Sequence, residues 1–159
     1  MPCTPKGIVR LLEHYEIATA GRRVAVVGRS VIVGRPVSLL LSLKGAMGDA
    51  TVTMCHSATR DLAAVTSSCE IVIAAMGVPR ALGAEAIGEG AVVIDVGINR
   101  IDDPTRPSGQ RLVGDVDEVA VRGRAAALTP VPGGIGPMTI AMLLENTWEA
   151  FARAEGIHV

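Results

Sequence analysis

The sequence predicts an α/β fold with a doubly wound, mostly parallel sheet and helices on both faces. Three observations support this prediction. Apolar segments of strand length alternate with segments of helical periodicity. The strand segments are nearly continuous aliphatic runs, which is typical of strands covered on both faces. The chain is 49% hydrophobic but only 2% aromatic, which favours such packing over an aromatic-rich β-sandwich. The predicted architecture is Rossmann-like.

Length and charge limit the function classes. We expect the 159 residues to form a single domain, 1–159. With 15 Lys and Arg against 16 Asp and Glu, the net charge of −1 argues against a nucleic-acid-binding protein or a polybasic membrane protein. Three cysteines in no metal-ligand spacing, and a start without a basic-then-apolar leader, predict a cytoplasmic protein with reduced thiols and no metal site.

Residues 125–144 carry no charge and have the length of a membrane span. Prolines and glycines between positions 130 and 137 interrupt this stretch. We therefore interpret it as a strand, a loop and a helix start.

The elements of the amino-terminal half follow from local signals. A first helix is expected to start at Thr4-Pro5, because a hydroxyl at the N-cap followed by proline favours helix initiation, and to run to Tyr15. Apolar runs predict strands at 22–28, 50–55 and 69–75. Between them we expect helices at 36–43 and 59–65, and a glycine-containing loop at 44–49.

The carboxyl-terminal half continues the alternation. Strands are expected at 91–96 and 125–129, with a solvated excursion at 99–110 because Asp, Pro, Ser and Gly dominate there. Asp115 is expected to cap a short helix through Val121. A final helix starts at Pro137 and carries an apolar stripe of Ile140, Leu143, Leu144, Trp148 and Phe151.

The turn after the first strand is the most informative segment. It contains Gly28 and Gly34 and leads into a helix. Such a turn lets backbone N–H groups and the helix dipole face an anion, and glycine allows close approach. Because the spacing is Gly-x-Ser-x-x-x-Gly rather than Gly-x-Gly-x-x-Gly, a tight turn with glycines for packing alone stays an alternative.

The end of the second strand bears on the cofactor. NAD-preferring Rossmann folds place a carboxylate there, but this strand ends Cys55-His56-Ser57. Arg29 lies in the neighbouring turn, and a cation with a hydroxyl suits a 2′-phosphate. The pattern therefore favours NADP. The alternatives are a solvated Arg29 and a His56 that serves only as a hydrogen-bonding residue.

Other polar and glycine-rich features have two interpretations each. The segment 129–139 holds three glycines and three prolines after a strand, which favours a binding role over an ordinary connection. Asp95 is either a catalytic carboxylate or, more commonly for such a position, a cap for backbone N–H groups. Lys6 is expected to be solvated, and Tyr15 has no lysine four residues later to form a proton-transfer pair.

Taken together these segments resemble the bifunctional methylenetetrahydrofolate dehydrogenase/methenyltetrahydrofolate cyclohydrolase family, the FolD type. The resemblance runs from Pro2 to about Phe151 and covers only the NAD(P)-binding domain of that family. The matching motifs stand in family order: Pro2–Gly7, Gly28–Gly34, Ala50–Thr53 with Cys55–Ser57, Val93–Asn99, Gly114–Val116 and Thr129–Thr139.

The resemblance implies the following site residues. Gly28, Arg29 and Ser30 hold the cofactor phosphates, with Arg29 and Ser57 at the 2′-phosphate, and Ile98 lines the nicotinamide end. The folate side of the cleft is formed by Pro132, Gly133, Gly134, Ile135 and Gly136.

The resemblance also implies an activity in tetrahydrofolate one-carbon metabolism. The family oxidises methylene-tetrahydrofolate with NADP⁺ and hydrolyses the methenyl product to formyl-tetrahydrofolate. Both steps use the lysine of a Tyr-x-x-x-Lys motif in the family's amino-terminal catalytic domain, which this sequence lacks. We therefore expect no catalytic residue in this chain, an inactive chain by itself, and a homodimer as in relatives. A free-standing nucleotide-binding or assembly module without turnover is the alternative.

Overall fold

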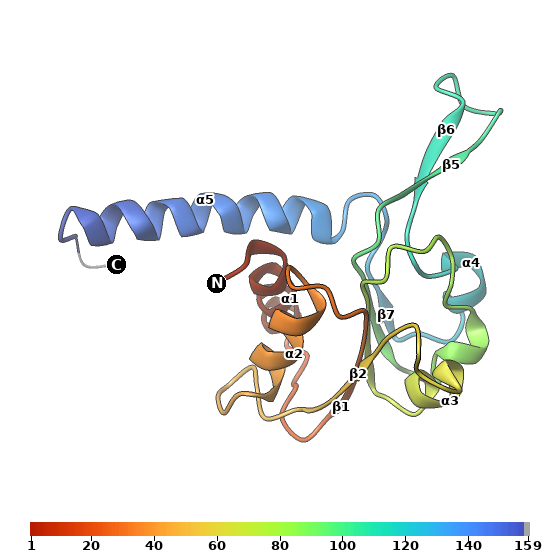
Figure 1. The fold of residues 1–159 in the computed structure, drawn as a ribbon, viewed down its shortest axis with the longest axis horizontal. Coiled ribbons are helices and arrows are strands. Elements are labelled where there is room, and N and C mark those ends of the chain that lie inside the picture. The colour runs from red at the N-terminus through yellow and green to blue at the C-terminus, as the bar shows by residue number, and fades with distance from the viewer. Residues whose placement is uncertain (158–159) are drawn as a thin grey trace.

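The computed structural model describes residues 1–157. Its central element is a five-stranded parallel sheet (Figure 1). The strands are β1 (Arg23–Val27), β2 (Thr51–Cys55), β3 (Ile71–Ala74), β4 (Val92–Asp95) and β7 (Ala127–Leu128). Their order across the sheet is β2-β1-β3-β4-β7, so the chain winds outward in both directions from β1. The predicted α/β class and parallel sheet are confirmed.

Helices cover both faces of the sheet. They are α1 (Cys3–His14), α2 (Gly34–Ser42), α3 (Leu62–Ser67), the 3-10 turn η1 (Ala84–Ala86), α4 (Glu118–Val121) and α5 (Ile135–Ala154). Alternate residues of β1 divide between two cores. Val24 and Val26 join Ile8 and Leu41 under α1 and α2, whereas Ala25 and Val27 belong to the core on the opposite face, with α3, η1 and α4.

The stretch expected as a solvated excursion is a β-hairpin. Strands β5 (Asn99–Asp102) and β6 (Gln110–Val113) pair antiparallel and project from the body of the molecule (Figure 1). The expectation of solvent exposure is right for most of its residues, and the strand pairing within the stretch was not predicted. The two strands contain only three apolar residues, Ile101, Leu112 and Val113, which are too few to mark a strand periodicity in the sequence.

Two predicted helix caps are also wrong. Thr4 lies inside α1, whose N-cap is Pro2, and its hydroxyl shares a 2.9 Å hydrogen bond with the hydroxyl of Thr139. The cap of α4 is Asp117, whose carboxylate accepts a bond from the amide of Ala120, whereas Asp115 is fully buried elsewhere. In both cases the side chain that local signals assign to a cap instead binds a residue distant in the sequence.

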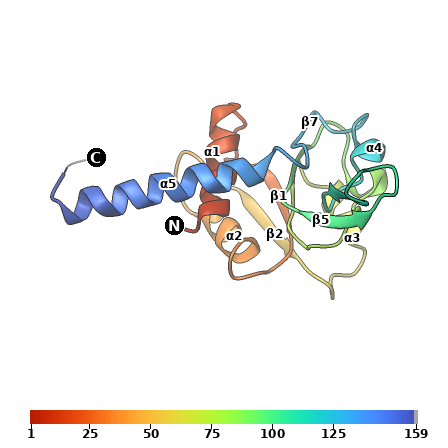
Figure 2. The same ribbon diagram turned by 90° about the horizontal axis from the view of Figure 1, so that it is seen from above.

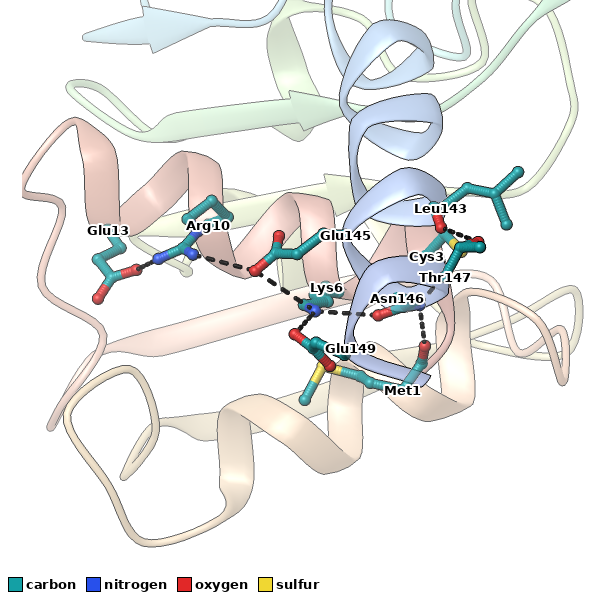
Figure 3. Close-up of polar contacts among 10 residues, drawn as sticks. All are labelled: Met1, Cys3, Lys6, Arg10, Glu13, Leu143, Glu145, Asn146, Thr147 and Glu149. Atoms are coloured by element: carbon teal, nitrogen blue, oxygen red, sulfur yellow. Dashed lines mark hydrogen bonds and ion pairs between the residues drawn. The ribbon is translucent and has the colours of Figure 1, made fainter. Parts of the chain in front are cut away.

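Helices α1 and α5 cross in contact, and a polar cluster joins them (Figures 2 and 3). The Lys6 ammonium donates to Asn146 Oδ1 at 2.9 Å and to Glu149 Oε1 at 2.7 Å, and lies 3.6 Å from Glu145 Oε1. Its side chain is only 16% exposed, so the expectation that Lys6 is solvated is wrong. The half-exposed Arg10 also pairs with Glu145.

The apolar stripe expected on the last helix lies on its solvent side. Its five members are each more than half exposed: Ile140, Leu143, Leu144, Trp148 and Phe151. The opposite side, with the buried Met142, faces α1. The helix begins at Ile135, two residues before the expected proline. Among residues 1–157 no helix is both long enough and apolar enough to cross a membrane.

Candidate functional site: a cavity at the carboxyl end of the sheet

A cavity of about 360 Å³ opens where β1, β2 and β3 end. Val27 and Gly28 continue β1 into it, and Ala75 and Met76 continue β3. Because β2 and β3 flank β1 on opposite sides, this is the point at which the winding direction of the sheet reverses. Open α/β sheets bind ligands at such a point, outside the carboxyl ends of the strands.

The two glycines of the turn are required by packing. Gly28 has φ +125°, and a Cβ there would lie 2.7 Å from the carbonyl carbon of Ala75. A Cβ on Gly34 would lie 2.6 Å from the carbonyl carbon of Gly28. The packing interpretation of these glycines is therefore supported. Because they have no side chain, the turn can lie against the ends of β1 and β3.

The turn also presents unpaired backbone donors. Within residues 1–157 the amides of residues 29–32 donate to no protein group. The Ser30 hydroxyl oxygen accepts bonds from the amides of Val33 at 3.1 Å and Gly34 at 3.3 Å, and the Ser30 carbonyl accepts from Arg35. The Ser30 hydroxyl proton stays available to donate. Four free amides in one turn fit the phosphates of a dinucleotide.

The structure brings the predicted 2′-phosphate residues together. Arg29, Ser30, His56 and Ser57 all line the cavity, and Arg29 and Ser57 are exposed. No acidic residue in the described part of the chain lines it. The ring Nδ1 of His56 accepts a 3.2 Å bond from the amide of Ala58, so this histidine has the ordinary hydrogen-bonding role that the sequence left open.

The residues assigned to the nicotinamide and folate sides lie apart from that cavity. Ile98 is 62% exposed, and its Cδ1 lies 3.8 Å from the position of a Cβ on Gly136. Pro132, which follows a cis peptide bond, lines a second cavity of about 650 Å³ beside the hairpin. Ile135 is only 3% exposed.

Asp95 holds backbone amides. Its Oδ1 accepts from Gly97 at 2.9 Å and from Asp115 at 3.0 Å, and its Oδ2 accepts from Val116 at 2.9 Å. Burial raises the pKa of this carboxyl, and the three amide donors oppose that shift. Of the two interpretations of Asp95, the geometry favours the capping one.

Asp115 is a polar residue whose role sequence reasoning missed. It is fully buried and binds two backbone amides and one side chain from distant segments. Its sequence signals are an Asp directly after a glycine, which local rules assign to a helix cap, and its place in the Gly114–Val116 motif of the family resemblance. No group of three His, Cys, Asp or Glu side chains within residues 1–157 is placed to hold a metal.

Comparison with known proteins agrees with this geometry. Residues 2–155 match the family described as tetrahydrofolate dehydrogenase/cyclohydrolase, NAD(P)-binding domain. The chain belongs to this family. The bifunctional protein FolD of Chlorobium luteolum is 56% identical over 155 residues, which are 98% of this chain and 52% of that protein. The chain thus spans about half the length of the curated relatives that it matches.

Two solved structures share the fold. The Trypanosoma brucei dehydrogenase-cyclohydrolase, solved with NADP and an inhibitor, is 46% identical with a TM-score of 0.88 and covers 97% of this chain and 51% of its own. The NAD-dependent dehydrogenase of Saccharomyces cerevisiae is 26% identical with a TM-score of 0.73 and covers 98% and 53%. Because the second neighbour is NAD-dependent, the choice of cofactor depends on individual residues and not on the fold.

Proposed function

We propose that residues 1–159 form one domain, the NADP-binding domain of a bifunctional methylenetetrahydrofolate dehydrogenase/methenyltetrahydrofolate cyclohydrolase. The cavity where Arg29, Ser30 and Ser57 meet is the observation that carries this proposal. In the proposed reaction methylene-tetrahydrofolate loses a hydride to NADP⁺, giving methenyl-tetrahydrofolate and NADPH. Water then adds to the methenyl group, and formyl-tetrahydrofolate and a proton are released.

In this scheme the chain's own residues bind and orient the cofactor. The free amides of residues 29–32 and the Ser30 hydroxyl donate to the pyrophosphate, and the Arg29 guanidinium and Ser57 hydroxyl bind the 2′-phosphate. Ile98 lines the nicotinamide end, and the Pro132–Gly136 segment forms the folate side. The cofactor supplies the hydride acceptor when it is bound.

Arg29→Ala tests the assignment. Loss of a charge-assisted hydrogen bond of about 1.5–3 kcal/mol weakens NADP⁺ binding on the order of 10- to 100-fold. NAD⁺, which lacks the 2′-phosphate, is expected to bind both chains alike. Arg23→Ala at the opposite end of β1 is the control, because it removes an exposed cation far from the cavity. Isothermal titration with both cofactors decides the matter, and equal losses for NAD⁺ and NADP⁺ would remove Arg29 from the 2′-phosphate.

We also propose that this chain alone has no dehydrogenase or cyclohydrolase turnover. Its two lysines lie away from the cavity: Lys6 is engaged between α1 and α5, and Lys44 lies in the loop that leads into the opposite end of β2. A general base of the lysine type is therefore supplied from outside these residues. Absorbance assays for NADPH formation and methenyl hydrolysis are expected to read zero, and clear turnover by the purified chain would contradict the proposal.

Self-association and location complete the proposal. We propose a homodimer, because the projecting hairpin keeps two strand edges that no other described strand covers. Sedimentation equilibrium is expected to give twice the mass of the chain, and a monomer at all concentrations would contradict the homodimer.

We place the protein in the cytoplasm, where its three free cysteines stay reduced.

A further inference from the structure

A single buried carboxylate joins three segments near the cofactor cavity. Asp115 lies between β6 and α4 and is 0% exposed. Its Oδ2 accepts bonds from the amides of Met76 at 2.7 Å and Gly77 at 2.8 Å, and its Oδ1 accepts from Asn99 Nδ2 at 2.8 Å. None of the ion pairs within residues 1–157 includes Asp115.

The segments that Asp115 joins are the two walls of the proposed cofactor cleft. Met76 lines the cavity that holds Gly28 and Arg29. Asn99 directly follows Ile98, the residue assigned to the nicotinamide end. Asp115 thus connects the phosphate side to the nicotinamide side through one side chain.

The surroundings of Asp115 are built around its carboxylate. Asp95 accepts the amide of Asp115 at 3.0 Å and so fixes its backbone. Any Cβ on Gly97 would lie 2.5 Å from the Asp115 amide nitrogen, so glycine is required where the Ile98 segment passes. A buried polar side chain is costly unless its atoms are hydrogen-bonded, and an apolar residue would fill the same space without that cost. The Asp115 carboxyl oxygens offset that cost by accepting hydrogen bonds from three converging donors.

We propose that Asp115 is a positioning residue that holds Met76–Gly77 and Ile98 in the relative placement that lets both ends of one dinucleotide bind. Asn99 is its link to the nicotinamide wall. The inference rests on the proposed function, since it assumes that NADP⁺ occupies the cleft.

Two ligands distinguish the contributions of the two walls to binding. NADP⁺ reaches both, whereas 2′-phospho-ADP-ribose lacks the nicotinamide and reaches only the phosphate side. Asn99→Ala releases only the Ile98 wall, so it is expected to raise the Kd of NADP⁺ about tenfold and to leave the Kd of 2′-phospho-ADP-ribose within about twofold. Asp115→Ala releases both walls and is expected to weaken both ligands about tenfold or more, with partial recovery in Asp115→Asn.

Thr19→Val is the matched control. Thr19 is equally buried, and its hydroxyl donates to the Gly48 carbonyl at 3.0 Å, near the amino-terminal ends of the strands. It is expected to lower the unfolding temperature while both Kd values stay within about twofold.

The outcomes discriminate between explanations. Unchanged Kd values in both Asn99→Ala and Asp115→Asn, or an equal loss of both ligands in Asn99→Ala, would overturn the positioning role. Because Asn99 is only half buried on the hairpin, its variant decides the question even where Asp115→Ala does not fold. If the native chain binds neither ligand, the proposed function fails together with this inference. If the native chain binds both ligands and the variants bind them equally well, only this inference fails.

Discussion

The close packing of the turn after β1 predicts a specific cost for one added methyl group. In Gly34→Ala the new Cβ would lie 2.6 Å from the carbonyl carbon of Gly28 and 3.0 Å from Cα of Arg29. The carbonyl oxygen of Gly28 lies closer still, and ordinary contact begins at 3.4 Å, so the turn must retreat by more than about 0.8 Å. Both neighbours are backbone atoms that cannot rotate away, unlike the end of a flexible side chain.

Overpacking of this kind costs about 1–3 kcal/mol of unfolding free energy. For a chain of this length each 1 kcal/mol lowers the midpoint of thermal unfolding by about 2–4 °C. Urea unfolding followed by circular dichroism measures the loss. Gly136→Ala is the control, because its Cβ meets nothing closer than 3.8 Å and it lies in α5, where alanine is the better helix former. Equal unfolding free energies in the two variants would refute the close packing of the turn.

The remaining predictions concern the cluster between α1 and α5. Lys6→Met is expected to lower the unfolding free energy by about 1–3 kcal/mol, because a largely buried ammonium with two hydrogen bonds is lost, whereas Arg10→Met at a half-exposed pair costs less than about 1 kcal/mol. The Lys6 bond holds the pKa of Glu149 below its ordinary value of 4.5. This carboxylate therefore stabilises the native state above pH 4.5, and its contribution disappears as the pH falls through the lowered pKa. Urea unfolding between pH 7 and 3 is expected to show the native chain's advantage over Glu149→Gln shrinking with falling pH. A constant difference would contradict the assignment.

The sheet was predictable because its signals are local. Each central strand is an aliphatic run flanked by turn residues, and the strand-turn-helix pattern around Gly28 places the ligand end of the sheet without a tertiary contact. The hairpin escaped prediction because its strands, such as Asn99–Asp102, have polar side chains on both faces. The periodicity of apolar residues in a sequence reflects which side chains are buried, and few side chains of this segment are buried.

The polar residues that sequence reasoning misassigned have partners far along the chain. Lys6 meets Asn146 and Glu149, which lie 140 and 143 residues later. Asp115 meets the amide of Met76, 39 residues earlier. No local pattern encodes such pairs, so solvation and helix capping were the natural expectations. The ligand-binding roles of Arg29, Ser57, Ile98 and the Pro132–Gly136 segment stay predictions.

Amide chemical-shift mapping with NADP⁺ tests the central claim most directly. In a ¹⁵N-labelled chain, titration with NADP⁺ is expected to shift the backbone amides of residues 29–32 and Ser57 first and most strongly, since the free donors of the turn bind phosphate. NAD⁺ is expected to shift the turn but to leave Ser57 nearly unmoved. Shifts confined to the residues around the hairpin cavity, with the turn unchanged, would contradict the account.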